Sequence, residues 1–294
     1  MRFITCRLPD GVEDPAILSE DGRQVWPLSW LGLSYETLSE AIPFLTPQVR
    51  YGLSLAIAGI PALPVEAVTL ESPIPAPAQD VICLGINYIA HSDEAEKYSA
   101  AAFATKHEDA IYFSKRVTRA VPDGGPIEAH TDLVKKLDYE CELAVVLGRD
   151  ARGVPAGQTR DYIFGYTILN DVSARDVQTA HKQWYFGKSL DGFTPIGPCI
   201  VTADAFADYP PRLGIRSFVN GEKRQDSNTA LQIFDIDHVI AELSQGMTLK
   251  AGTIIATGTP AGVGMGMDPP QFLKPGDVVR CEIEGIGTLT NPVK

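Results

Sequence analysis

The sequence predicts an α+β protein in which β-strands dominate, with a small α+β domain ahead of a larger β-rich one. Short apolar runs separated by glycine and proline fill the chain from residue 80 onward, and stretches with helical spacing are few there. The stretch 72–78 carries three prolines in alternation, which excludes a helix and suits an extended connector. We therefore predict a small N-terminal domain at 1–72, a proline-rich linker at 73–79, and a domain at 80–294 built as a roll or closed sheet of mostly antiparallel strands.

The N-terminal domain is expected to combine a β-hairpin with helical turns. Residues 3–8 have the pattern of a strand, and the runs 16–18 and 24–26 flank Glu20-Asp21-Gly22, a hairpin-type turn signal. Apolar residues then recur at helical spacing between 35 and 60. This part of the chain is therefore of mixed α+β character.

The C-terminal domain alternates strand-like runs with turns. The expected strands lie at 81–85, 111–113, 140–147, 162–169, 199–201, 214–219, 253–256 and 277–283. Asn220-Gly221, directly after one of these runs, is a strong signal for a tight hairpin. The clearest helix is expected at 235–243, and a second short one at 93–105, which leaves the domain β-dominated.

Composition and charge exclude several classes of protein. The chain of 294 residues holds 25 Lys and Arg against 37 Asp and Glu, a net charge of −12, and no long basic run, so we expect no nucleic-acid partner. No window approaches the roughly 20 apolar residues of a membrane span. The five cysteines form no CxxC pair, and residues 1–6 do not resemble a signal peptide. We therefore expect a cytoplasmic protein with no membrane partner.

Two glutamates alternate within an apolar, strand-like run. Glu140 and Glu142 are two residues apart, which on a strand directs both carboxylates to one face, and the flanking run 143–147 is apolar enough to be buried. Neighbouring buried carboxylates repel each other, and a hard cation with oxygen ligands would offset that repulsion. The alternative is an exposed strand face with two solvated acids.

Asp171 stands at the mouth of a predicted strand that ends at Leu169. It is placed to be a third oxygen ligand, and the alternative is the N-cap of a helical turn, a common use of Asp. Together with Glu140 and Glu142 it would form a three-carboxylate site with open coordination positions, as magnesium chemistry usually requires.

His91 and Glu94 are three residues apart in a segment of possible helical character. On a helix they share a face and can hydrogen-bond, and a histidine oriented by a carboxylate is a general-base arrangement. The alternative is a surface histidine with a chance acidic neighbour.

Lys188 lies among aromatic residues and glycines, in the run from Trp184 to Phe193. A partly desolvated lysine suits an anion or a polarised carbonyl, whereas the alternative is an ordinary surface lysine. The small residues at 257–264 follow another predicted strand and either approach a ligand with backbone N–H groups or form a plain turn.

Five motifs occur in an order that resembles the fumarylacetoacetate hydrolase family. They are Gly85 to His91, Tyr139 to Val146, Asn170 to Gln178, Gly187 to Ser189, and Thr257 to Pro260. The resemblance extends over residues 80–294, and its combination of Glu-x-Glu with Asp-Val-Ser-Ala-Arg-Asp is highly specific.

The resemblance implies a fold, an assembly and a metal. Members of the family have a mixed β-roll or β-sandwich catalytic domain and are usually dimeric, so a homodimer is expected. The resemblance also implies a Mg²⁺ ion, or Mn²⁺ or Ca²⁺, on Glu140, Glu142 and Asp171.

The resemblance further implies roles for residues around the metal. His91 and Glu94 match the water-activating pair, on a segment at 91–106 that closes over the site, and Lys188 matches the lysine that holds an oxo or carboxylate oxygen of the substrate. The residues that match substrate-contact positions are Arg175, Gln178 and Thr259, together with Lys188. The chain departs from its relatives at Arg116, where they usually have proline, and an extra cation there would favour a more anionic substrate.

The function that follows is a metal-dependent hydrolase. It would cleave a C–C bond in a small 1,3-diketo or 2-oxo acid, of the acylpyruvate or fumarylpyruvate type, with water activated by His91 and Glu94 and an enolate stabilised by the metal. Alternatives on the same site are an oxaloacetate decarboxylase or tautomerase, and a 2-oxo-3-deoxy acid dehydratase or hydratase. A metal-holding protein without catalysis is the alternative from a different class.

Overall fold

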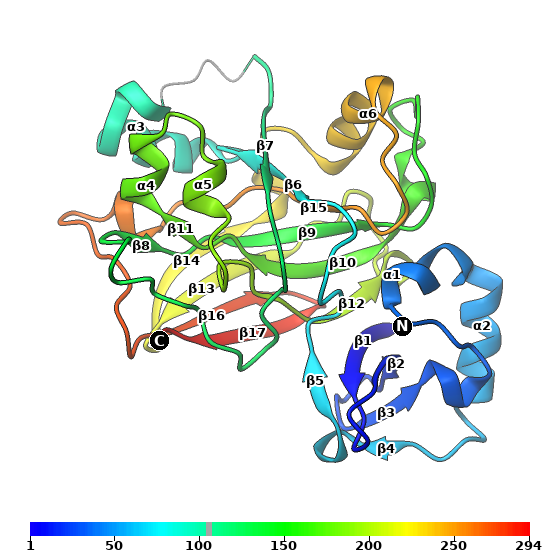
Figure 1. Ribbon diagram of the computed structural model, residues 1–294. Coiled ribbons are helices and arrows are strands. Elements are labelled where there is room, and N and C mark those ends of the chain that lie inside the picture. Colours follow the sequence, from blue (N-terminus) through cyan, green and yellow to red (C-terminus); the bar gives the residue numbers. More distant parts are fainter. Residues whose placement is uncertain (104–107) are drawn as a thin grey trace.

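Two β-sheets packed face to face form the centre of the protein (Figure 1). The computed structural model describes residues 1–103 and 108–294. The larger sheet has the order β4-β3-β2-β1-β12-β10-β9-β15-β6-β7, with β5 paired to β1 outside this path. Its strands are β1 (Arg2–Arg7), β2 (Glu13–Leu18), β3 (Gln24–Pro27), β4 (Leu63–Pro64), β5 (Thr69–Glu71), β6 (Val81–Gly85), β7 (Ile111–Lys115), β9 (Cys141–Leu147), β10 (Ile163–Asn170), β12 (Ile196–Thr202) and β15 (Ile254–Ala256).

The second sheet covers one face of the first. It has the order β14-β13-β16-β17, and a separate two-stranded ladder joins β8 to β11. Apolar side chains from both sheets, such as Val145 and Ile283, form the core between them. The bounds are β8 (Leu137–Asp138), β11 (Ser173–Ala174), β13 (Gly214–Val219), β14 (Glu222–Asn228), β16 (Val278–Ile283) and β17 (Gly287–Pro292).

Helices lie at the edges of the sheets, and side-chain caps fix where several of them begin. The Thr37, Thr46 and Asp235 side chains accept hydrogen bonds from backbone N–H groups in the first turns of α1, α2 and α6. The helices are α1 (Leu38–Ala41), α2 (Pro47–Ala56), α3 (Ile89–Phe103), α4 (Arg175–Ala180), α5 (Tyr185–Lys188) and α6 (Ile236–Gly246). The 3₁₀ turns are Leu28–Leu31, Ile42–Phe44, Val65–Ala67, Thr159–Tyr162, Ala203–Ala205, Thr229–Leu231 and Gly264–Gly266.

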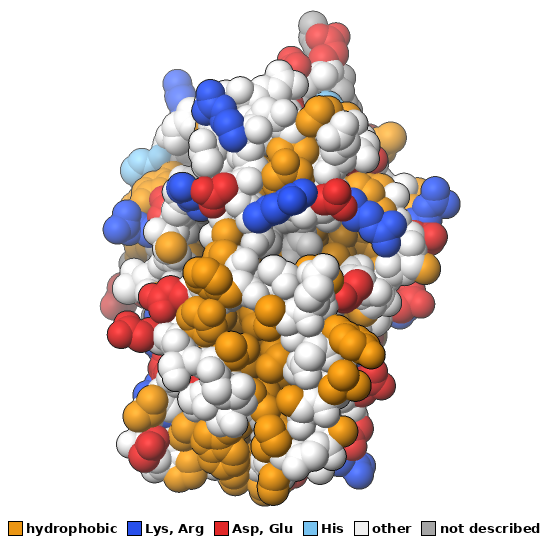
Figure 2. Space-filling view, turned by 90° about the vertical axis from the view of Figure 1, so that its right-hand side faces the viewer, with side chains coloured by type: hydrophobic (Ala, Val, Ile, Leu, Met, Phe, Trp, Pro, Cys, Tyr) orange, Lys and Arg blue, Asp and Glu red, His pale blue; other side chains and the backbone are white. Residues whose placement is uncertain are grey.

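The N-terminal strands continue the large sheet. β1 pairs antiparallel with β12, with Arg2 opposite Val201 and Phe3 opposite Ile200. A lobe made of β1 to β5 with α1 and α2 extends from this junction (Figure 1). Many hydrophobic side chains gather on the lower part of the face shown in Figure 2. The domain limits 1–72 and 80–294, with the linker at 73–79, stay a prediction.

The β-dominated α+β class is confirmed. Nearly all strand pairs are antiparallel, and β15 with β6 is a parallel pair, so the sheet is mixed. The Asn220-Gly221 hairpin joins β13 to β14, with both residues in the left-handed region at φ 52° and 82°. The helix expected at 93–105 begins earlier, at Ile89, and its last two positions lie outside the described residues, as does the end of the 91–106 segment.

Two further features bear on the exclusions drawn from composition. All five cysteines are buried with free thiols, at positions 6, 83, 141, 199 and 281. Among the helices within 1–103 and 108–294, none has the length and apolar character needed to cross a membrane.

Candidate active site

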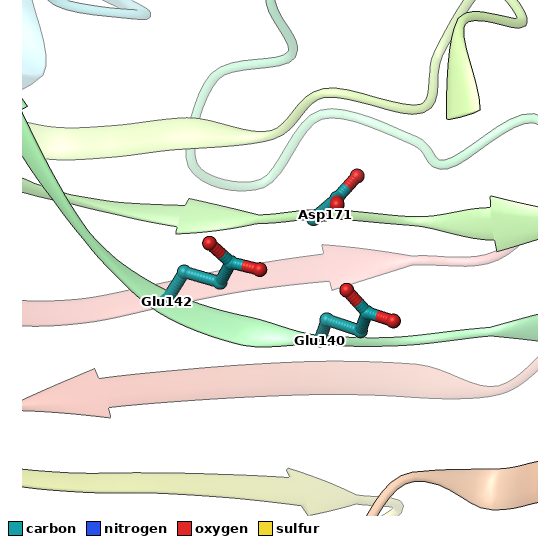
Figure 3. A group of neighbouring side chains, drawn as sticks. All are labelled: Glu140, Glu142 and Asp171. Carbon is teal, nitrogen blue, oxygen red and sulfur yellow. The ribbon is translucent and has the colours of Figure 1, made fainter. Parts of the chain in front are cut away.

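Three carboxylates from two neighbouring strands meet on one face of the large sheet (Figure 3). Side chains two residues apart on a strand point to the same face, so Glu140 and Glu142 share a face with Ala144 of β9. In the same way Asp171, directly after β10, shares a face with Leu169. Ala144 and Leu169 both pack on the face of the sheet that is turned away from the sandwich core. One oxygen from each carboxylate lies within 4.8 Å of the other two, and all three residues are buried. We call Glu140, Glu142 and Asp171 the acidic triad.

Two buried lysines contact the acidic triad. Lys188 Nζ donates to Asp171 Oδ2 at 2.6 Å and to Glu140 Oε2 at 2.8 Å, and Lys115 Nζ donates to Asp171 Oδ1 at 2.6 Å. Burial opposes the charge of Lys188, but Asp171 and Glu140 outweigh burial and raise its pKa. Burial dominates at Lys115 and lowers its pKa despite Asp171. Of the two lysines, Lys188 is therefore the one held more firmly in its charged form.

Arg175 joins the triad to a fourth buried acid. Its Nη1 lies 2.6 Å from Glu140 Oε1, and its Nε donates to Asp138 Oδ2 at 2.9 Å. Burial raises the pKa of Glu140, but Lys188 and Arg175 outweigh that effect and hold the pKa well below its usual range. Arg175 Nη2 is buried and has no hydrogen-bond partner in the described part of the chain, so this nitrogen of the guanidinium group can still donate to a ligand.

Glu142 is the member of the triad that forms no ion pair with a cation in the described part of the chain. Its Oε2 accepts a 2.7 Å hydrogen bond from the Gly258 N–H, whereas Oε1 is buried and has no partner among the described residues. Burial, then Asp171 and Glu140, raise its pKa well above the usual value. An orphaned carboxylate oxygen beside two further carboxylates is the donor set that a hard divalent cation requires, so these residues fit such an ion.

His91 lies near the triad on helix α3, and Glu94 lies one turn further along the same helix. His91 Nδ1 lies 3.5 Å from Glu94 Oε2, and His91 is only 5% exposed. Both oxygens of Glu94 accept from the Gly262 N–H, at 2.9 and 3.0 Å. The loop that follows β15 therefore fixes Glu94, and Glu94 in turn lies beside the imidazole.

One pocket collects the titratable groups and has two chemically different halves. Its polar half is formed by His91, Glu140, Arg175, Gln178, Lys188 and Thr259. Its apolar half is formed by Leu84, Gly85, Ile86, Phe113, Trp184 and Met265. A lining that combines cations and polar groups with apolar side chains suits a small organic acid.

Gln178 and Thr259 belong to the polar half in different ways. Gln178 Oε1 accepts a 3.2 Å hydrogen bond from Arg175 Nη1, one turn earlier on α4. The Thr259 hydroxyl donates to the Cys141 carbonyl at 2.9 Å and accepts from Gln225 Nε2 at 2.7 Å. The hydroxyl of Thr259 therefore binds the backbone of β9 at Cys141, the residue between the two glutamates.

Residues 80–294 match the family model of the fumarylacetoacetate (FAA) hydrolase C-terminal domain. The chain belongs to the fumarylacetoacetate hydrolase family. The predicted family is therefore confirmed, and the matched range contains every residue of the acidic triad and of the pocket.

Relatives of this fumarylacetoacetate hydrolase family member include proteins of several activities. It is 43% identical over 226 residues to a Bacillus subtilis protein named oxaloacetate tautomerase YisK. The aligned region covers 77% of this chain and 73% of that protein. Among solved structures, a fumarylacetoacetate hydrolase from Exiguobacterium antarcticum is 38% identical with a TM-score of 0.85, covering 100% of this chain and 99% of the other. The maleylpyruvate hydrolase of Sphingobium sp. SYK-6, in complex with manganese(II) and pyruvate, is 28% identical with a TM-score of 0.78, covering 100% and 98%.

The structure brings the sequence-predicted residues of this family member together. The six polar lining residues and the partners Glu94, Glu142 and Asp171 include all nine positions named from the sequence. Asp171 caps no helix, since the N-cap of α4 is Ala174. Arg116 is exposed and is not among the described residues that line the pocket.

Sequence reasoning missed two charged residues at this site. Lys115 is fully buried on Asp171, and Asp138 is fully buried on Arg175 while accepting from the Gly264 and Met265 N–H groups. The sequence signal that could have found Lys115 is its position at the end of an apolar strand, directly before Arg116.

Proposed function

We propose that this protein is a Mg²⁺-dependent enzyme, with Mn²⁺ or Ca²⁺ as possible substitutes, that hydrolyses a C–C bond in a small 1,3-diketo acid of the acylpyruvate or fumarylpyruvate type. The observation that carries this proposal is that the buried His91 lines the same pocket as Glu140, Lys188 and Arg175 and has Glu94 beside its imidazole. A base beside fixed cations is the arrangement that activates water next to a developing negative charge.

The acidic triad would hold the metal, and the orphaned Glu142 Oε1 supports this assignment. A divalent cation there would act as a Lewis acid toward the 2-oxo group of the substrate. The unpaired Nη2 of Arg175 is a free donor for a substrate carboxylate or oxo oxygen. Gln178 and Thr259 complete the polar wall around such a head group.

His91 acts as the general base. It takes a proton from water while Glu94, held by Gly262, stabilises the imidazolium. The hydroxide adds to the acyl carbonyl carbon, and the bond from that carbon to the methylene carbon breaks. Lys188 and Arg175 stabilise the electron pair left on the 2-oxo fragment, which then takes up a proton from His91. The products are one carboxylic acid and one 2-oxo acid, so a single water is consumed.

A second candidate is tautomerisation of oxaloacetate. It is favoured by the relative from Bacillus subtilis, which is 43% identical and is named oxaloacetate tautomerase. In that reaction His91 would move a proton between the carbon next to the oxo group and the enol oxygen, with no net consumption of water. Lys188 and Arg175 would keep the same role toward the enolate oxygen.

A substrate panel separates the two candidates. The purified protein is incubated with acetylpyruvate, fumarylpyruvate or oxaloacetate, with Mg²⁺ or with EDTA, while the ultraviolet bands of diketone and enol and the released pyruvate are followed. Mg²⁺-dependent loss of a diketo acid with equal amounts of 2-oxo acid and carboxylic acid supports the hydrolase. Faster enol–keto exchange of oxaloacetate without release of carboxylic acid supports the tautomerase, and no Mg²⁺-dependent change in any substrate contradicts both.

A homodimer and a cytoplasmic location remain part of this proposal. Both come from the sequence: the dimer from the family resemblance, and the location from five cysteines that form no CxxC pair. Sedimentation of the purified protein would test the dimer, since a single species of monomer mass at micromolar concentration contradicts it.

A further inference from the structure

The apolar half of the pocket depends on a close contact between an indole ring and a glycine. A Cβ atom built on Gly85 would lie 2.1 Å from Cζ3 and 2.6 Å from Cη2 of Trp184. These distances are far inside van der Waals contact, so the ring rests directly on the backbone of β6 at this position. Only glycine at position 85 leaves room for this placement of Trp184.

Trp184 packs against Phe113, whose ring lies beside Lys188. Lys188 Nζ lies 5.2 Å from the centroid of the Phe113 ring, and the Phe113 centroid lies 5.3 Å from that of Trp184, with the rings edge to face at 73°. Trp184 also packs with the small apolar cluster that includes Ile86 and Met265. The ring is therefore held from three sides, by β6, by Phe113 and by this cluster.

The two halves of the pocket predict how a small organic acid is oriented. The acid head belongs with Lys188, Arg175 and the triad, because carboxylate and oxo oxygens need donors and cations there. The remaining tail is directed to the apolar half, where the indole of Trp184 is a lining group packed against the Phe113 ring. A rigid aromatic boundary limits tail length more strictly than a flexible side chain would.

We propose that Trp184, seated on Gly85, is the specificity-determining residue that sets the length of the substrate tail. The inference rests on the proposed function, because it takes the 2-oxo acid head to be held by the polar half. The inference adds a limit to the substrate class, namely 2-oxo or diketo acids whose tail is short enough not to collide with the indole of Trp184.

The test measures binding rather than turnover, by isothermal titration of the Mg²⁺-loaded protein with pyruvate, 2-oxopentanoate and 2-oxooctanoate. In the wild type, affinity rises by about fourfold for each methylene that becomes buried, and then falls once the tail reaches the ring. In Trp184→Ala the ratio of the Kd for 2-oxooctanoate to that for pyruvate drops by about tenfold or more. Trp184→Phe gives an intermediate ratio, because it retains a smaller ring.

Trp30→Ala is the matched control, since Trp30 is 49% exposed and lies in the N-terminal lobe. It should leave the Kd ratio unchanged. Thermal unfolding of each variant verifies that it is folded, and Trp184→Phe keeps the test valid if Trp184→Ala does not fold.

A double-mutant cycle tests the contact itself. Gly85→Ala forces the indole to move and should change the Kd ratio by about threefold or more, whereas the same change in the Trp184→Ala background should have a much smaller effect, because only the 3.3 Å contact with Ile111 Cγ2 remains. Gly52→Ala is the matched control, because a Cβ there meets nothing within 4 Å.

The outcomes are distinct. If the wild type binds pyruvate but Trp184→Ala keeps the wild-type Kd ratio, or if Gly85→Ala acts equally in both backgrounds, the assignment of Trp184 is overturned and the proposed function stands. If no 2-oxo acid binds the Mg²⁺-loaded wild type, both are overturned.

Discussion

Glu142 lies beside two further carboxylates in a buried position. No lysine or arginine among the described residues forms an ion pair with it, while Glu140 and Asp171 lie within a few ångströms. Its charge is therefore a cost in the metal-free protein and an advantage once a cation is bound.

We expect Glu142→Gln to stabilise the metal-free protein and to abolish its response to metal. Relief of repulsion worth about 1 kcal/mol would raise the Tm by about 2–4 °C in EDTA. The wild type at a Mg²⁺ concentration of 100 times Kd should gain about 2.7 kcal/mol, and the variant almost nothing. Glu222→Gln, at a side chain that is 69% exposed, is the matched control. An equal Mg²⁺-induced Tm shift in Glu142→Gln and wild type would contradict the assignment of Glu142 as a ligand.

His91 is expected to be needed for turnover but not for metal binding. His91→Ala and Glu94→Gln should each lower kcat by about 100-fold or more, because general-base catalysis contributes at that scale. The Mg²⁺-induced Tm shift should survive in both variants, since neither residue belongs to the triad. His238→Ala, at a histidine that is 48% exposed on α6, is the control. Near-wild-type kcat in both site variants would refute the general-base role.

The positions of most site residues could be predicted from the sequence, but their ionic partners could not. The two-residue spacing of Glu140 and Glu142 fixes their common face, because alternation along a strand is local geometry. The sequence does not assign Lys115 to the site, because its contact with Asp171 depends on where β7 lies relative to β10. The two residues are 56 positions apart in the sequence. Its neighbour Arg116 was conspicuous in the sequence and is exposed in the structure.

At the scale of elements, the loop after β15 holds a side chain of helix α3 in position. The Gly262 N–H holds both oxygens of Glu94, and a Cβ on Gly266 would lie 2.6 Å from the carboxylate carbon of Glu94. The absence of a side chain at Gly266 therefore gives Glu94 its place beside His91.

Gly266→Ala should displace Glu94 and lower kcat by about tenfold to 100-fold, the usual effect of misplacing a catalytic group by about 1 Å. The Mg²⁺-induced Tm shift should remain, because the triad is untouched. Gly246→Ala serves for comparison, since a Cβ there meets nothing within 4 Å. Unchanged kcat in Gly266→Ala would show that Glu94 does not need this contact.

Elements with a strong local signal were predictable, and those defined by partners were not. The strands around β9, β10 and β13, and the Asn220-Gly221 hairpin, follow from apolar runs and turn chemistry. The start of α3 at Ile89 was missed, because no Ser, Thr, Asp or Asn cap marks it in the sequence as the Asp235 cap marks α6. The pairing of β1 with β12 joins residues about 200 apart, and no local pattern encodes such a contact.

At the scale of the whole molecule, we expect the N-terminal lobe and the rest of the chain to unfold together. β1 is paired to β12 in one sheet, and Arg119 contacts Glu13 at 2.5 Å and Glu71 at 3.1 Å across the same junction. Differential scanning calorimetry of the full chain should therefore show one transition whose calorimetric and van't Hoff enthalpies agree. Two resolved transitions would show that the predicted domains at 1–72 and 80–294 are independent.

The buried charges of the site also determine the order in which its ligands arrive. Asp138, Glu140, Glu142 and Asp171 face three cations, Lys115, Lys188 and Arg175, so with every group ionised this centre carries a net charge of −1. The raised pKa of Glu142 brings the metal-free centre closer to neutral, so in either state it has no net positive charge to attract an anionic acid until a divalent cation makes its charge +1. Binding should therefore be sequential, cation first, and titration of pyruvate into the EDTA-treated protein should release no heat beyond dilution. Equal pyruvate affinity with and without Mg²⁺ would show that the order is random.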